Sequence, residues 1–287
     1  MTSRSRRVRC CSAALAGCVA GMLAGAPSPA AALSTAPVSA LSATSAAALL
    51  AQASMYKGLG FDACTAPSPA AMTAWWNSTN YAAAGIYIGG LNRACGDGYL
   101  SASWVKSVSR IGWKLIPTYV GRQAPCLTKS HLQLIDAKTV AAQGVAAADD
   151  AVSHAAALGL VKGSAIYLDL ESYPRNNAAC TTGVLKYESA WTSRLHARGY
   201  LSGFYSSAGS GITDLARSKM AGLVRPDALW IARWDNKASA SDPALSPLVW
   251  CHHQRLKQYA GGHTETHGGV KLNIDNNYLD GPVARVG

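Results

Sequence analysis

The chain has 287 residues, is 49% hydrophobic and 14% charged, and carries a formal net charge of +11. These values are those of an ordinary globular protein with room for one large domain. After residue 50 no apolar run is long enough to cross a bilayer, which predicts no transmembrane segment in the mature chain. No basic run interleaved with aromatic residues suggests a nucleic acid as partner.

Residues 1–32 have the features of an export signal that is removed from the mature protein. Four arginines precede a stretch of small apolar residues, and APSPAAA (26–32) offers a cleavage site. The segment SRRVRCC (5–11) resembles a twin-arginine export signal. LAGC (15–18) resembles a lipobox, but the residues after Cys18 stay apolar, so lipidation is the weaker interpretation. We expect a protein that is secreted or associated with the cell wall.

Removing residues 1–32 takes away four arginines and no acidic residue, which leaves a formal net charge of +7. In an exported protein this charge favours cell-wall glycan or another anionic polysaccharide as partner over a nucleic acid. Surface charge that serves only solubility is the alternative. We expect a monomer.

The remaining chain divides into an uncharged Ala/Ser-rich segment, residues 33–56, predicted to be a linker, and one domain, residues 57–287. In the domain, short apolar runs alternate with helical patterns. Strands are predicted over 58–63, 84–90, 113–121, 164–172, 200–207, 228–235, 255–261 and 272–279. Helical patterns cover 68–81, 101–111, 128–160, 182–198 and 213–223, the third of them predicted as two helices or one broken near Gly144.

Strands that alternate with helices imply parallel pairing through right-handed crossovers. Eight such units fit an α/β fold of the (β/α)8 TIM type. Residues 261–271 carry no helical pattern, so the seventh helix is predicted to be degenerate.

Two carboxylates stand together in AIYLDLESY (165–173), where Asp169 and Glu171 follow a buried strand two positions apart. Residues i and i+2 of a strand point to the same face, and buried charges are seldom left there unless paired or used. A helix cap and an ion pair would be the structural alternative. Other acids, Asp62, Asp235 and Asp275, lie at the ends of strands or in the last strand, and barrel enzymes place their sites at the carboxyl ends.

Aromatic residues accompany these acids at the same level of the predicted barrel: Tyr119, Tyr173, Tyr205, Trp234 and Tyr259. An acidic floor with an aromatic rim is what a sugar-binding cleft needs, because rings stack on pyranose faces and carboxylates carry the chemistry. Core packing is the alternative for each ring taken singly.

Five short motifs in order carry a family resemblance over residues 57–280: GFDA, YLDLES, LWIARWD, KQY and IDNN. They resemble the strand-end motifs of glycoside hydrolase family 25, the barrel-fold muramidases. They are closer still to an exported bacterial glycoside-hydrolase-like family, domain of unknown function 1906. The resemblance implies that Glu171 is the catalytic acid and that Asp62, Asp169 and Asp275 surround it. Together with the aromatic residues at the strand ends, it leads us to expect substrate contacts from Tyr119, Tyr205, Trp234, Asp235, Gln258, Tyr259 and Asn277.

The function implied is hydrolysis of a β-linked, N-acetylated amino-sugar glycan of the cell wall. The alternative is a catalytically weak or inactive barrel that binds glycan or organises the envelope, because a fold does not establish an activity. Since Asp169 and Glu171 share one strand face, they cannot readily straddle a sugar ring. We therefore predict a substrate-assisted reaction, with Glu171 as acid and Asp169 orienting the acetamido group.

Cysteine positions predict two disulfides, since loops after adjacent barrel strands are neighbours. The expected pairs are Cys64–Cys95 and Cys126–Cys180, with Cys95–Cys126 as competitor and Cys251 left free. No cofactor and no metal is expected. The histidines of His263-x-Glu265-x-His267 have metalloprotease-like spacing, but the flanking glycines argue against the helix that such a site requires.

Overall fold

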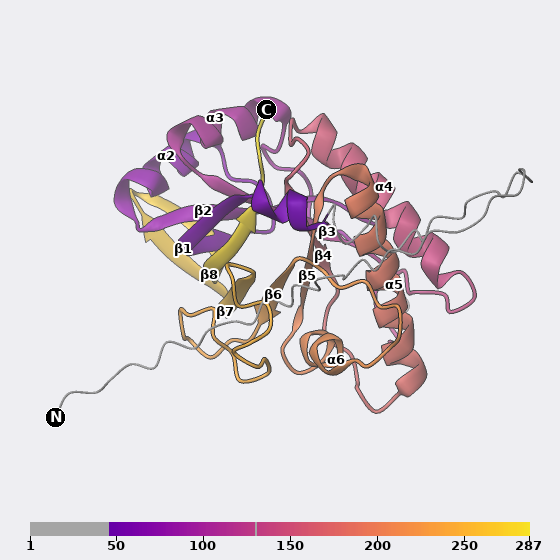
Figure 1. The fold of residues 1–287 in the computed structure, drawn as a ribbon. Coiled ribbons are helices and arrows are strands. Elements are labelled where there is room, and N and C mark those ends of the chain that lie inside the picture. Colours follow the sequence, from indigo (N-terminus) through magenta and orange to yellow (C-terminus); the bar gives the residue numbers. More distant parts are fainter. Residues whose placement is uncertain (1–45, 130) are drawn as a thin grey trace, which may run out of the picture.

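The computed structural model describes residues 46–129 and 131–287, so the predicted export signal and Cys18 lie outside it. Eight strands close into one barrel in chain order, and helices cover its outer face (Figure 1). The strands are β1 (Ser54–Asp62), β2 (Tyr81–Gly89), β3 (Lys114–Val120), β4 (Ala165–Asp169), β5 (Leu201–Ser207), β6 (Ala228–Ala232), β7 (Arg255–His267) and β8 (Val270–Val283). The helices between them are α2 (Pro69–Ser78), α3 (Ala102–Ile111), α4 (Val140–Ala157), α5 (Ala178–Arg198) and α6 (Gly211–Arg217). The predicted eight-stranded α/β barrel is confirmed.

Local sequence signals set the helix ends. The Ser68 hydroxyl accepts a hydrogen bond from the Ala71 amide (3.1 Å) and Pro69 takes the first helical position, so α2 begins there. Asn177 caps α5 in the same way, and the helix ends at Gly199, whose φ of 82° lies in the left-handed region that glycine tolerates.

Helix α4 is continuous over Val140–Ala157, so the predicted break near Gly144 is wrong. Gly144 lies where α4 packs on α5, and a Cβ placed there would lie 2.5 Å from the Tyr187 carbonyl oxygen and 2.9 Å from the Ala190 Cβ. This glycine therefore serves close helix packing instead of ending the helix.

The last two strands depart from a regular barrel. Strands β1 to β7 pair in parallel, whereas β8 runs antiparallel to both β7 and β1. Residues 261–267, predicted as a connection, extend β7, and the chain turns at Gly268 and Gly269, both with positive φ. The hairpin lies against α2, where the Trp75 indole donates to the Val270 carbonyl (3.0 Å). A hairpin thus stands in place of the seventh helix.

The start of the barrel lies earlier than predicted. Strand β1 begins at Ser54 and pairs with β8 from there, and residues 46–51 are helical. The end of the predicted linker therefore belongs to the folded domain.

The barrel interior is a packed core, which closes the barrel at the amino ends of the parallel strands. The buried Tyr167 points inward and donates to the Pro282 carbonyl (2.7 Å), and Gly203 leaves the space that its ring occupies. Trp230 packs against it with the ring centroids 5.8 Å apart. A ligand can therefore reach only the mouth of the barrel, at the carboxyl ends of the parallel strands.

Disulfides join Cys64 to Cys95 and Cys126 to Cys180, each with its Cα atoms 5.5 Å apart, as predicted. The expectation that Cys251 stays free is wrong, because Cys251 is a disulfide cysteine as well. No helix in the described part of the chain is long and apolar enough to span a membrane.

Candidate active site

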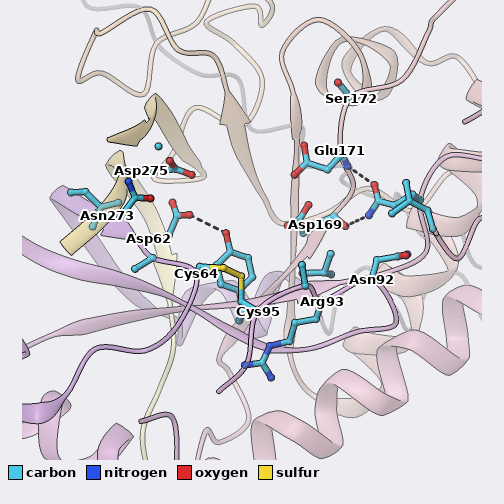
Figure 2. A pocket seen from close by; sticks show the side chains of 18 of the residues that line it. Asp62, Cys64, Asn92, Arg93, Cys95, Asp169, Glu171, Ser172, Asn273 and Asp275 are labelled. Carbon is cyan, nitrogen blue, oxygen red and sulfur yellow. Dashed lines mark hydrogen bonds between the residues drawn. A yellow bond between two sulfur atoms is a disulfide. The ribbon is translucent and has the colours of Figure 1, made fainter. Parts of the chain in front are cut away.

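The mouth of the barrel opens into a cleft of about 760 Å³ lined by four carboxylates, Asp62, Asp169, Glu171 and Asp275. They stand on opposite walls, with Asp62 and Asp275 on one side and Asp169 and Glu171 on the other (Figure 2). The strand order explains this placement, because β1 and β8 are neighbours and β4 lies across the barrel from them. Asp62 and Asp275 also face each other in register between the two antiparallel strands.

The β1–β8 wall is dense in hydrogen bonds. Asp62 is only 2% exposed and accepts from the Tyr87 hydroxyl (3.0 Å), the Asn277 amide (2.6 Å) and the Gln258 amide (3.1 Å). Asn277 is held in turn by the Trp230 indole, which donates to its side-chain oxygen (2.8 Å). This network holds the Asp62 carboxyl in one position and leaves it little freedom to move.

Gln258 lies beneath both acids of this wall and uses all four of its hydrogen-bonding positions. Its amide nitrogen donates to Asp62 (3.1 Å) and to Asp275 (3.2 Å). Its oxygen accepts from the Tyr205 hydroxyl (2.9 Å) and the Trp234 indole (2.9 Å). No hydrogen-bonding position of Gln258 remains for a substrate, so the direct contact expected from the sequence is not available.

The acidic side chains of the β4 wall have fewer hydrogen bonds to the protein than Asp62 has. Gln123 connects its backbone to the loop after β3, donating to the Asp169 carbonyl (3.1 Å) and accepting from the Glu171 amide (2.8 Å), as Figure 2 shows. The Asp169 side chain is 5% exposed, and its Oδ1 is buried without a partner in the described part of the chain. The Glu171 side chain is accessible from the cleft. Buried oxygens without partners are rare, so Asp169 is a candidate for a ligand contact.

Burial raises the pKa of all four acids in the cleft, and repulsion by neighbouring acids adds to the rise for Asp169, Glu171 and Asp275. Loss of solvent raises the pKa of Asp169 well above its usual range, and the charges of Glu171 and Asp62 add to this. Desolvation and then Asp62 raise the pKa of Glu171, while Lys129 opposes the rise. Desolvation, with Asp62 next, raises the pKa of Asp275 to about 7. Carboxyl groups of this kind can hold a proton near neutral pH.

A second hollow of about 390 Å³ adjoins the first and shares Glu171, Ser172 and Trp234 with it. Trp234 is 64% exposed and stands between the two hollows, and its ring covers Gly261, where a Cβ would lie 2.5 Å away. One face of the indole is thus supported while the side chain remains largely open to solvent. An exposed, anchored indole of this kind offers a stacking surface for a sugar ring.

Three of the expected substrate-binding residues lie elsewhere. Tyr119 points outward, packs on Trp191 and donates to Asp150 (2.7 Å). Asp235 forms an ion pair with the buried Lys257 (2.7 Å). Tyr259 follows the inward-facing Gln258 and is not part of either cleft lining. Burial raises the pKa of Tyr259, and the charge of Glu265 adds to this rise. The alternation of strand side chains explains Tyr119 and Tyr259, each one position away from an inward-facing residue.

The sequence analysis missed Tyr87 and Gln123. Tyr87 lies in the strand AGIYIGG, so a search for polar aromatics at every strand end could have found it. Gln123 lies beyond β3 in a loop and carries no pattern that distinguishes it from other loop residues.

The segment His263–His267 forms a polar cluster on a strand. Glu265 accepts from Asn276 (3.1 Å), His267 (2.7 Å), His263 (2.9 Å) and Tyr81 (3.0 Å), and its pKa falls to about 2 because these donors outweigh its desolvation. Among the described residues no group of three potential ligands is arranged to hold a metal ion.

The barrel and its acidic mouth define a protein of the glycoside-hydrolase-like class. The sequence profile of the Rv2525c-like, glycoside hydrolase-like domain matches residues 73–279, and the chain belongs to this family. No curated protein sequence matches the chain.

Solved structures share the fold. The Tat-secreted protein Rv2525c of Mycobacterium tuberculosis, solved with L-tartrate, is 18% identical with a TM-score of 0.53, over 78% of this chain and 96% of that one. The modular autolysin LytC of Streptococcus pneumoniae is 14% identical with a TM-score of 0.50, over 80% of this chain and 47% of that one. At these identities the likeness shows the fold alone.

Proposed function

We propose that this protein is a glycoside hydrolase that cleaves a β-linked, N-acetylated amino-sugar glycan of the cell wall. The observation that carries the proposal is the β4 wall, where a carboxyl with a raised pKa, Glu171, stands beside the buried, unpartnered Oδ1 of Asp169. An acid for the leaving oxygen and an acceptor for a substrate N–H are the two groups that a substrate-assisted cleavage needs.

In this mechanism Glu171 gives its proton to the glycosidic oxygen as the bond to the anomeric carbon breaks. The acetamido oxygen of the substrate attacks that carbon from the other side, and its N–H donates to Asp169 Oδ1. A water molecule then attacks the anomeric carbon and opens the cyclic intermediate, while Glu171 takes a proton from that water. The N–H contact would restore the ionised form of Asp169, which burial alone disfavours. Asp275 would hold the sugar from the opposite wall.

The two adjoining hollows support a polymeric substrate. Glu171, Ser172 and Trp234 belong to both hollows, so a glycan chain could occupy each side while its scissile bond lies at Glu171. This arrangement predicts cleavage at internal bonds of the glycan. Export of the protein is part of the proposal: its two mouth disulfides suit an oxidising compartment, and the related protein Rv2525c is Tat-secreted.

The test is turnover on purified cell-wall glycan and on a soluble oligomer of N-acetylglucosamine. We expect new reducing ends from the wild type and a loss of at least about 10²-fold in Glu171→Gln, the contribution typical of a general acid. Glycan binding by calorimetry should remain in the variant. If the wild type binds the oligomer but cleaves no glycan, the protein is a glycan-binding barrel and the proposed activity is wrong.

A further inference from the structure

Gln258 joins the stacking surface of Trp234 to the two acids of the β1–β8 wall. On one side it holds the exposed Trp234 indole, and on the other it donates to both acids of the β1–β8 wall. The side chain is buried at 2% exposure, so these bonds form away from bulk water. Hydrogen bonds in such surroundings are stronger than in water and polarise one another.

The orientation of this amide follows from its partners. The Trp234 indole nitrogen can only donate, so it must face the amide oxygen. The amide nitrogen must then face Asp62 and Asp275, each of which can accept. Turning the amide over would place two donors together at Trp234 and leave both carboxylates facing an oxygen. One orientation therefore satisfies every group.

We propose that Gln258 is a positioning residue that couples stacking of a sugar on Trp234 to the protonation of Asp62 and Asp275. Its N–H groups donate to both carboxylates and so stabilise their ionised forms, which burial disfavours. When a sugar ring presses on Trp234, the indole bond to Gln258 tightens and so do the two bonds to the acids. Bound substrate thus promotes the ionisation of Asp62 and Asp275, which face its scissile bond.

Other charged groups surround the same acids. Glu171 faces Asp275 across the cleft and raises its pKa, while His263 on the β7 extension lowers it. Asp62 further receives hydrogen bonds from Tyr87 and Asn277. Gln258 differs from all of these groups because it alone, among the described contacts, joins both acids to the stacking surface.

This inference rests on the proposed function, but its first test does not require turnover. Carboxyl ¹³C NMR would follow the titration of Asp275 in the wild type, in Gln258→Leu and in Trp234→Phe, which keeps a ring but lacks the indole N–H. Loss of the Gln258 donor in Gln258→Leu should raise the pKa of Asp275 above about 7. Trp234→Phe should shift it the same way by less. Binding of an N-acetylglucosamine oligomer should lower this pKa in the wild type only.

Activity gives the second readout, if the wild type cleaves glycan. The acid limb of the kcat profile should move to higher pH in Gln258→Leu, with kcat reduced about tenfold and KM raised less. A combined Gln258→Leu and Trp234→Phe variant should lose less than the product of the single losses, because both substitutions break one connection. Tyr205→Phe, which removes only the hydroxyl donor to the same amide oxygen, serves as the matched control for a lost hydrogen bond.

The proposal fails if Gln258→Leu folds, as judged by circular dichroism and thermal unfolding, yet Asp275 titrates as in the wild type. It fails equally if bound oligomer leaves the titration unchanged in the wild type. An inactive wild type that still shows the coupled titration would overturn the proposed function and leave the coupling standing.

Discussion

The two walls of the cleft carry two acids each but are built differently. On the β1–β8 wall Asp62 has four hydrogen bonds from three side chains, and Gln258 ties it to Asp275. On the β4 wall one oxygen of the Asp169 side chain has no partner among the described residues, and hydrogen bonds with Gln123 hold only the backbone. A carboxyl group whose hydrogen bonds are all made to the protein suits a structural role in the wall. A carboxyl oxygen without a hydrogen bond suits a contact that forms only when substrate is bound. We therefore place the proposed chemistry on the β4 wall.

The largest effect after Glu171 is expected at Asp169. Asp169→Asn should lower kcat by about 10²-fold or more, because the amide cannot support the developing charge on the acetamido group as a carboxylate does. KM should change little. The measurement is kcat and KM on N-acetylated oligomers beside their de-N-acetylated counterparts. Rapid cleavage of the de-N-acetylated oligomer by the wild type would refute substrate assistance.

Loss of the Cys64–Cys95 disulfide should weaken both stability and activity. This bond lines the cleft and joins the loop that follows Asp62 to the loop after β2. The double variant Cys64→Ser, Cys95→Ser should lose about 2–4 kcal/mol of unfolding free energy in denaturant titrations. Cys126→Ser, Cys180→Ser should lose a similar amount but retain more activity, because this second disulfide is not part of either cleft lining. Equal activities in the two variants would count against a role of the first bond in the wall.

The free energy of unfolding should decrease as the pH rises, because of one carboxyl group far from the cleft. Glu188 is fully buried on α5, and burial raises its pKa to about 8 from an ordinary value near 4.5. Since the folded-state pKa is the higher one, its stabilisation is complete below about pH 4.5 and is lost as the pH rises through about 8. Between pH 5 and 9 the loss should be on the order of 4 kcal/mol. Glu188→Gln should flatten this part of the stability profile, and an unchanged slope would contradict the assignment.

The smallest effect is expected at Tyr119. Tyr119→Phe removes the hydroxyl bond to Asp150 and should cost about 1 kcal/mol of stability. Turnover should change by less than about twofold, since the ring points to the helices. A large loss of kcat would mean that the outward placement of Tyr119 is wrong.

The sequence predicted most of the barrel because each strand is an apolar run between polar or glycine-rich segments. It could not predict the direction of β8, since a strand carries no mark of its partner's direction and the helix-free segment 261–271 was compatible with a loop. At the mouth, Asp62 and Asp169 could be placed because they end strands, Tyr205 as an aromatic residue near the end of its strand, and Trp234 by the resemblance. Asn277, expected to contact the substrate, is instead fully buried and donates to Asp62. Tyr119 was misplaced because a shift of one residue along a strand exchanges the two faces.

The most direct measurement compares one acid from each wall on one soluble N-acetylated oligomer, with kcat and binding determined for Glu171→Gln and Asp275→Asn. The account predicts that Glu171→Gln loses at least about 10²-fold in kcat at every pH while still binding the oligomer. Asp275→Asn should lose less and should change the pH profile, because its carboxyl titrates near pH 7. The opposite result, an inactive Asp275→Asn beside a Glu171→Gln that cleaves as fast as the wild type, would place the chemistry on the β1–β8 wall and contradict the account.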